Sequence, residues 1–144
     1  MSDRKRKIAA MMGGVSLEHE VSLRSGSGVC NALAASGYEP VEILLQKDGL
    51  WKFADGEVLP VQQAVGKLVQ LAPDCVFIAL HGPNGEDGRM QGMLDCLGFP
   101  YTGSGCAASA LSMDKIRAKA VVAAASVPTA RVADIIFPWR CLPP

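Results

Sequence analysis

Short, strongly apolar segments recur along the chain and are separated by longer segments with helical periodicity. Residues 8–12 (IAAMM) and 74–80 (DCVFIAL) are such apolar runs, and runs of this kind are typical of strands buried on both faces of a parallel sheet. Residues 38–45 predict another strand, and residues 99–102 predict a short fourth one. Two Asp-Gly pairs bracket Trp51 and Phe53 and predict a hairpin between the second and third of these strands.

The intervening segments predict helices. The first is capped by Ser16 and ends at Gly37. Its expected apolar stripe is formed by Val21, Val29, Ala32 and Leu33. The other predicted helices cover residues 61–71, the apolar positions 90–97, and an Ala-rich stretch over 107–125.

Alternating strands and helices predict an α/β fold with three layers, an open and mostly parallel sheet with helices on both faces, as in Rossmann-like domains. Such sheets bind ligands at the carboxyl ends of their strands, so the loops after the strands should carry the functional residues. We expect one domain over residues 1–130. Residues 134–144 (DIIFPWRCLPP) lack a regular period, and 131–144 are therefore expected to form an irregular tail.

Composition narrows the function classes. The chain has 144 residues, 49% of them hydrophobic, and 14 basic residues balance 14 acidic ones. The balanced charge argues against nucleic acid as a partner. No stretch reaches the roughly 18 apolar residues that a membrane span needs. Five widely spaced cysteines without a CxxC motif, and only two histidines, predict a cytoplasmic protein without a metal site of its own.

The loop after the first strand, residues 13–20, is the first candidate site. Its two glycines let a ligand approach the backbone, and Gly14 lies beside the amino end of the predicted helix. Glu18 could bind the ammonium group of a ligand. Alternatively, Glu18 complements the helix dipole and Glu20 pairs with Arg24 one turn later.

The loop after the apolar strand at 74–80 is the second candidate. His81 begins a polar loop, residues 81–88, that contains three glycines. A histidine at the carboxyl end of a central strand can donate or accept a proton in a ligand-binding cleft. In the alternative interpretation, His81 bridges carbonyl groups of the loop while Asp87 caps the next helix.

Two further segments have ligand-binding patterns. Residues 103–108 (GSGCAA) match the GxGxxA variant of the dinucleotide fingerprint, but they follow the last predicted strand rather than the first. Lys115 and Lys119 lie on one face of the predicted helix. Water could solvate both ammonium groups, or an anion such as a phosphate could bind there.

Several of these segments together resemble the N-terminal domain of D-alanine–D-alanine ligases. The resemblance covers about residues 7–132. The matching blocks are 13–23 (GGVSLEHEVSL), 81–92 (HGPNGEDGRMQG), 100–105 (PYTGSG), 108–115 (ASALSMDK) and Lys119.

The resemblance implies the pre-ATP-grasp domain of an ATP-grasp ligase of peptidoglycan synthesis. In that reaction ATP phosphorylates the carboxylate of one D-alanine, and the amine of a second D-alanine attacks the acyl phosphate. By the resemblance, Glu18 holds the ammonium group of the first D-alanine, His81 orients the substrate near the reacting carboxylate, and Lys115 contacts an ATP phosphate. Gly14, Val21 and Ser22 would complete the substrate site, and two subunits would pair as a homodimer.

The resemblance also leaves parts unmatched. The ATP-grasp domains of this family, with the carboxylates that bind Mg²⁺ and most contacts to ATP, follow the segment matched here. We therefore expect residues 131–144 to begin or replace that region, and the chain to be inactive alone. Two alternatives remain: a non-catalytic binding or dimerisation module derived from this domain, and a small dinucleotide-binding protein.

Overall fold

The computed structural model describes residues 4–130, so the tail predicted at 131–144 lies outside the described residues. Its sheet has five strands in the order β4-β3-β2-β1-β5. β1 pairs in parallel with both β2 and β5, whereas β3 and β4 add an antiparallel hairpin at one edge. The strands are β1 (Lys7–Gly13), β2 (Glu39–Leu45), β3 (Trp51–Phe53), β4 (Val58–Leu59) and β5 (Cys75–Ile78).

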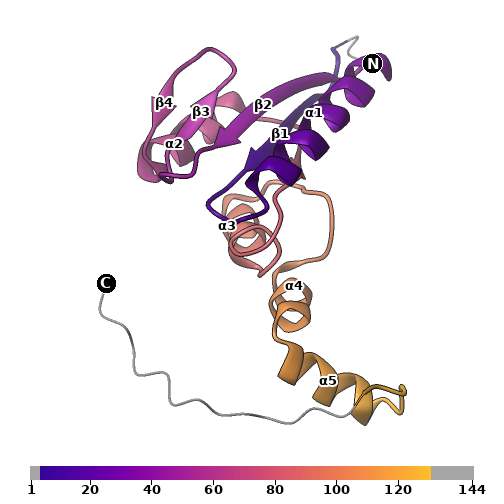
Figure 1. Cartoon of the computed structure of the whole chain (residues 1–144). Helices are drawn as coiled ribbons and strands as arrows, with labels where there is room; N and C mark the ends of the chain where they lie inside the picture. Colours follow the sequence, from indigo (N-terminus) through magenta and orange to yellow (C-terminus); the bar gives the residue numbers. More distant parts are fainter. Residues whose placement is uncertain (1–3, 131–144) are drawn as a thin grey trace.

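Helices cover both faces of this sheet (Figure 1), which confirms the predicted open, mostly parallel α/β architecture. Helix α1 packs on one face, and α2 and α3 pack on the other. None of the helices within residues 4–130 has the length and apolarity needed to cross a bilayer. The helices are α1 (His19–Ala35), α2 (Val61–Leu71), α3 (Arg89–Leu97), α4 (Cys106–Met113) and α5 (Lys115–Ala124).

Strand β1 is the centre of the core because its side chains are buried on both faces. Ala9 and Met11 belong to the larger cluster, which includes Leu68 of α2 and Leu94 of α3. Ala10 and Met12 belong to the smaller cluster under α1. This double burial explains why the strand is a continuous apolar run rather than an alternating one.

The buried face of α1 differs from the predicted one. Its buried residues are His19, Ser22, Gly26 and Cys30, whereas Val21 is 42% exposed. The expected N-cap is also displaced, because Ser16 Oγ accepts a hydrogen bond from the Glu18 N–H in a turn before the helix. Small side chains face the sheet because α1 approaches β1 closely, and this close approach overrides the apolar periodicity.

The carboxyl-terminal third departs from prediction in two places. The Ala-rich stretch predicted as one helix is divided at Asp114, whose extended backbone ends α4 and whose carboxylate accepts a hydrogen bond from the Arg117 N–H to begin α5. The predicted fourth strand at 99–102 is reduced to a single parallel bridge between Val76 and Tyr101. The backbone of Asp114 thus ends one helix, and its side chain caps the next.

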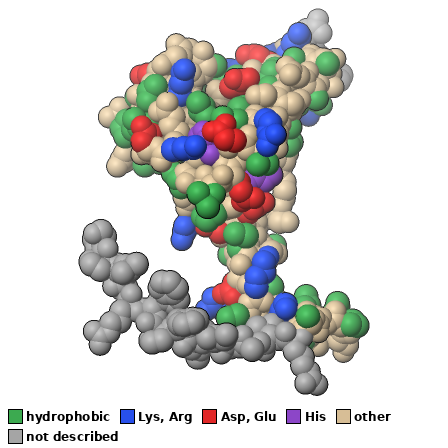
Figure 2. Space-filling model, viewed as in Figure 1, with side chains coloured by type: hydrophobic (Ala, Val, Ile, Leu, Met, Phe, Trp, Pro, Cys, Tyr) green, Lys and Arg blue, Asp and Glu red, His purple; other side chains and the backbone are tan. Residues whose placement is uncertain are grey.

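Helices α4 and α5 project away from the sheet (Figure 1). Helix α4 packs on α3, and α5 packs mainly on α4. No residue of α5 is buried, and Ile116 and Val121 are each 51% exposed. Figure 2 shows hydrophobic side chains on the surface of this projecting part.

Gly26 is where α1 lies closest to the sheet. A Cβ at this position would lie 2.6 Å from the Cβ of Met12. We expect Gly26→Ala to lower the free energy of unfolding by about 1–3 kcal/mol, because overpacking outweighs the better helix propensity of alanine. The measurement is urea unfolding followed by circular dichroism.

Gly28 provides the matched control, because it lies in the same helix with nothing within 4 Å of the corresponding Cβ position. Gly28→Ala should raise the free energy of unfolding by up to about 1 kcal/mol. Equal effects of the two substitutions would contradict the close approach of α1 to Met12.

Candidate functional site

The two loops singled out in the sequence meet at the carboxyl ends of β1 and β5. The Ser16 hydroxyl donates a 2.8 Å hydrogen bond to the carbonyl oxygen of His81. At the neighbouring strand, the Gly14 N–H donates to the carbonyl oxygen of Leu45 over 2.7 Å. The parallel sheet therefore brings loop 13–20 and loop 81–88 together, as expected from the topology.

Ser22 connects the two strand ends beneath these loops. Its hydroxyl accepts from the Gly13 N–H at 2.8 Å and donates to the carbonyl oxygen of Ala79 at 2.7 Å. The Ser22 side chain is fully buried, and both of its hydrogen bonds are to backbone groups. His19 is also buried, with its Nδ1 2.6 Å from the Gly14 carbonyl oxygen. Ser22 and His19 thus hold the first loop in place, and the Ser22 hydroxyl does not face solvent.

Glu18 lies over the second loop. Glu18 is exposed, and its Oε2 atom lies 2.8 Å from the position that a Cβ on Gly82 would occupy. Gly82 has a φ of +71°, so both its backbone and this carboxylate favour glycine there. Glu20 forms an ion pair with Lys47 at 3.5 Å rather than with Arg24. The alternative pairing of Glu20 with Arg24 is therefore wrong.

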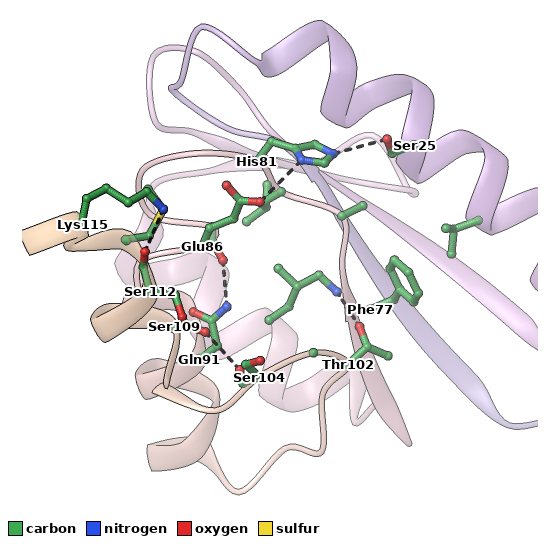
Figure 3. Close-up of a pocket in the computed structure, with 17 residues that line it drawn as sticks. Ser25, Phe77, His81, Glu86, Gln91, Thr102, Ser104, Ser109, Ser112 and Lys115 are labelled. Carbon is green, nitrogen blue, oxygen red and sulfur yellow. Dashed lines mark hydrogen bonds and ion pairs between the residues drawn. The ribbon is translucent and has the colours of Figure 1, made fainter. Parts of the chain in front are cut away.

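His81 lies between a carboxylate and a hydroxyl group (Figure 3). Its Nδ1 is 3.8 Å from Glu86 Oε1, and its Nε2 is 3.3 Å from Ser25 Oγ. The other oxygen of Glu86 accepts a 2.8 Å hydrogen bond from the Gly82 N–H. Glu86 therefore fixes the turn that follows His81 and places a negative charge beside its ring. The alternative interpretation, in which the imidazole bridges carbonyl groups of the loop, is therefore wrong, because both nitrogens face side chains.

Buried contacts stabilise the rest of this loop. A Cβ on Gly85 would lie 2.4 Å from the Cβ of Leu80, so the loop packs directly on the strand end. Gln91 Nε2 donates a 2.8 Å hydrogen bond to the Gly85 carbonyl oxygen, while its Oε1 is buried without a partner among residues 4–130. Asp87 accepts hydrogen bonds from the N–H groups of Asn84 and Arg89. Asp87 therefore supports the turn before α3, but the prediction that it caps this helix is wrong, because Gly88 is the N-cap and no side chain caps the helix.

A pocket of about 640 Å³ opens between the end of β5 and the start of α5. His81, Glu86, Ser109 and Lys115 are among its lining residues (Figure 3). His81 also lines a smaller, more apolar pocket of about 220 Å³ that includes Gly14. The histidine therefore stands between two cavities, in the position expected of a residue that contacts a ligand.

Lys115 and Lys119 lie in different surroundings. Lys115 lines the large pocket, and its Nζ donates to the Ser112 carbonyl oxygen at 2.9 Å. Lys119 is not among the residues lining that pocket, and its Nζ lies 3.4 Å from the Ala130 carbonyl oxygen. Of the two lysines, Lys115 alone offers its charge to a ligand in this cavity.

Within residues 4–130, no group of three or more His, Cys, Asp or Glu side chains could hold a metal ion. The described residues therefore do not fit a Mg²⁺ site. Gly103 to Cys106 follow an isolated bridge and lead into α4. They do not form the turn after the first strand that the dinucleotide fingerprint requires.

Sequence comparisons place these loops in a known context. A family model described as the D-ala D-ala ligase N-terminus matches residues 7–104. D-alanine--D-alanine ligase of Desulforudis audaxviator is 50% identical over 123 residues, which are 85% of this chain and 35% of that protein. The enzyme of the same name from Pseudomonas putida is 43% identical over 136 residues, 94% of this chain and 38% of that protein.

Solved structures agree with the sequence comparisons. The D-alanine-D-alanine ligase of Coxiella burnetii superposes with a TM-score of 0.74 at 30% identity, over 88% of this chain and 44% of that one. The VanG D-Ala:D-Ser ligase of Enterococcus faecalis gives a TM-score of 0.72 at 30% identity, over 89% and 44%. The chain thus spans between 35% and 44% of the length of these relatives. Because the family model covers most of the chain, including both site loops, the chain belongs to the D-alanine–D-alanine ligase N-terminal domain family.

Proposed function

We propose that this chain is the part of an ATP-dependent D-alanine–D-alanine ligase that binds the first substrate. The observation that carries the proposal is the meeting of Glu18 and His81 at the joined carboxyl ends of β1 and β5. The Glu18 carboxylate lies against Gly82, the neighbour of His81, so both side chains can reach one small amino acid. The reaction would supply dipeptide to cytoplasmic peptidoglycan synthesis.

Each group has a role that suits its chemistry. The Glu18 carboxylate binds the ammonium group of D-alanine, and His81 donates a hydrogen bond to the carboxyl group that ATP phosphorylates. Gly14 lines the smaller pocket together with His81, and the buried Ser22 supports the first loop through the backbone. Val21 is 42% exposed and is not among the residues that line either pocket, so its role in the substrate site rests on the resemblance. Lys115 stabilises a phosphate of ATP at the mouth of the large pocket.

ATP and Mg²⁺ need further residues. Lys115 is a single cation, and residues 4–130 contain no carboxylate cluster for the metal. We therefore assign Mg²⁺ and most contacts to ATP to the regions of the ligase that lie beyond this segment in the longer relatives. The fold of this segment is shared by a D-Ala-D-Ala ligase and a D-Ala:D-Ser ligase, so we assign the choice of the second substrate to the same later regions.

A chimeric ligase tests the proposal. Residues 1–130 of this chain replace the corresponding segment of the Desulforudis audaxviator enzyme, which is 50% identical over the shared region. We expect phosphate release from Mg-ATP that depends on D-alanine. A folded chimera without such release, beside an active parent enzyme, would contradict the proposed site. The 144-residue chain alone is assayed in parallel, and we expect no release from it.

Pairing of two subunits is the second proposal, and the exposed apolar residues of α5 favour it. Ile116 and Val121 are half exposed on a helix with no buried residue, and these apolar side chains form the surface that we propose a second subunit covers. We expect sedimentation equilibrium to give a homodimer. The double variant Ile116→Lys, Val121→Lys should shift the chain to monomer, and an unchanged mass would exclude α5 from the interface.

A further inference from the structure

Ser25 contacts His81 but has no role in the proposed function so far. It lies on α1, one turn after Ser22, and its residue is exposed. Its Oγ is 3.3 Å from Nε2 of His81, and both residues line the large pocket (Figure 3). The Ser22 hydroxyl forms hydrogen bonds with two backbone groups. The Ser25 hydroxyl faces the imidazole of His81 instead.

The surroundings of the ring determine which nitrogen carries the proton. A neutral imidazole has one N–H donor and one acceptor nitrogen, and the partner of each nitrogen selects the tautomer. An ionised carboxylate only accepts hydrogen bonds, and Glu86 Oε1 faces Nδ1. The proton is therefore favoured on Nδ1, which leaves Nε2 to accept a hydrogen bond from the Ser25 hydroxyl.

The other charged groups near the ring are consistent with this assignment. Glu18 approaches from the loop before α1 and lies against Gly82. Lys115 lines the same pocket from the start of α5, but its ammonium group donates to the Ser112 carbonyl oxygen. Among the ion pairs of the described residues, only the one with Glu86 places a charge within 4 Å of the His81 ring.

We propose that Ser25 is a positioning residue that holds neutral His81 in the Nδ1–H tautomer by donating a hydrogen bond to Nε2. At 3.8 Å, Glu86 is beyond hydrogen-bond distance from Nδ1, so this N–H stays available to a ligand oxygen. The inference deepens the proposed function, on which it rests for its consequence: His81 can donate to the carboxyl group of D-alanine without being protonated.

Nitrogen-15 NMR of the 144-residue chain tests the tautomer without any substrate. The nitrogen that carries the proton resonates upfield of the one that carries the lone pair, and loss of signals in His81→Gln distinguishes His81 from His19. We expect the proton of His81 on Nδ1 in the unchanged chain. In Ser25→Ala the two ring shifts should converge as the tautomers mix, and Ser25→Thr should restore their separation.

Ser27→Ala is the matched control, because Ser27 is exposed on α1 two residues away, on another side of the helix. It should leave the His81 shifts unchanged. Both serine positions are exposed and alanine is a good helix former, so both variants should fold. A proton on Nε2 in the unchanged chain, or His81 shifts that are identical in Ser25→Ala, would overturn the proposal.

The chimeric ligase measures the consequence for the reaction. Ser25→Ala should lower kcat/KM for D-alanine about fivefold to tenfold, the effect of one lost hydrogen bond, and Ser25→Thr should recover most of it. An inactive chimera with the expected NMR result would reject the proposed function but not the contact between Ser25 and His81. An active chimera, together with His81 tautomer ratios that do not change in Ser25→Ala, would support the proposed function but reject the positioning role of Ser25.

Discussion

Replacing Glu18 by glutamine in the chimeric ligase is expected to lower kcat/KM for D-alanine by about 10- to 100-fold. The substitution keeps the shape of the side chain but removes the negative charge that pairs with the substrate ammonium group. A hydrogen bond to a charged partner contributes about 1.5–3 kcal/mol, and each 1.4 kcal/mol corresponds to tenfold. The effect should appear mainly in the KM for D-alanine, measured by coupled phosphate release at saturating Mg-ATP.

Glu20→Gln is the control for this prediction. It makes the same chemical change two residues away, where the carboxylate pairs with Lys47 and its side chain is 71% exposed. Surface pairs of this kind contribute little to stability or binding, so the KM for D-alanine should stay within about twofold. Equal kinetics for both variants and the parent chimera would return Glu18 to its alternative role as a helix-dipole partner.

The central strands could be predicted because each depended on a local signal, and the meeting of two loops could be predicted from their order. Residues 8–12 and 74–80 are continuous apolar runs, and in the structure β1 is buried on both faces. Once these runs are parallel neighbours, the loops that follow them must meet at one edge of the sheet. The contact of Glu18 with Gly82, the neighbour of His81, follows from that topology, although these residues are more than 60 positions apart in sequence.

Helix α1 shows where the apolar pattern failed. The prediction assigned the buried face to the large apolar residues Val21 and Val29, but Ser22 and Gly26 face the sheet. Helix and strand approach so closely that no Cβ fits at Gly26, and Ser22 supplies hydrogen bonds to two strand ends. Periodicity measures hydrophobicity and therefore misses a face selected for small size and for hydrogen bonding.

The side-chain contacts of His81 also could not be predicted from the sequence. Glu86 was visible in the polar loop, but the division of its two oxygens between the Gly82 N–H and the His81 ring depends on the three-dimensional turn. Ser25 comes from a different element, 56 residues earlier. Contacts of this type require the register between α1 and β5, which no local pattern encodes.

Replacing His81 by alanine in the chimera is expected to lower kcat about 10²- to 10³-fold, the usual cost of losing one donor at a reacting oxygen. The residue is about one-third exposed in its side chain and contributes only its ring to the contacts with Glu86 and Ser25. Its backbone hydrogen bond with Ser16 does not depend on the side chain. The free energy of unfolding should therefore change by less than about 1 kcal/mol, as for a surface substitution.

His19→Ala provides the contrast, because His19 is buried and its ring contacts the Gly14 carbonyl oxygen. That substitution should lower the free energy of unfolding by about 1–3 kcal/mol, since it removes a buried ring and leaves the partly buried Gly14 carbonyl oxygen without its partner. Urea unfolding and initial rates measured on both variants separate the two roles. A His81→Ala chimera with the kcat of its parent would remove His81 from the reaction, and the Glu18 result would then stand as evidence for substrate binding alone.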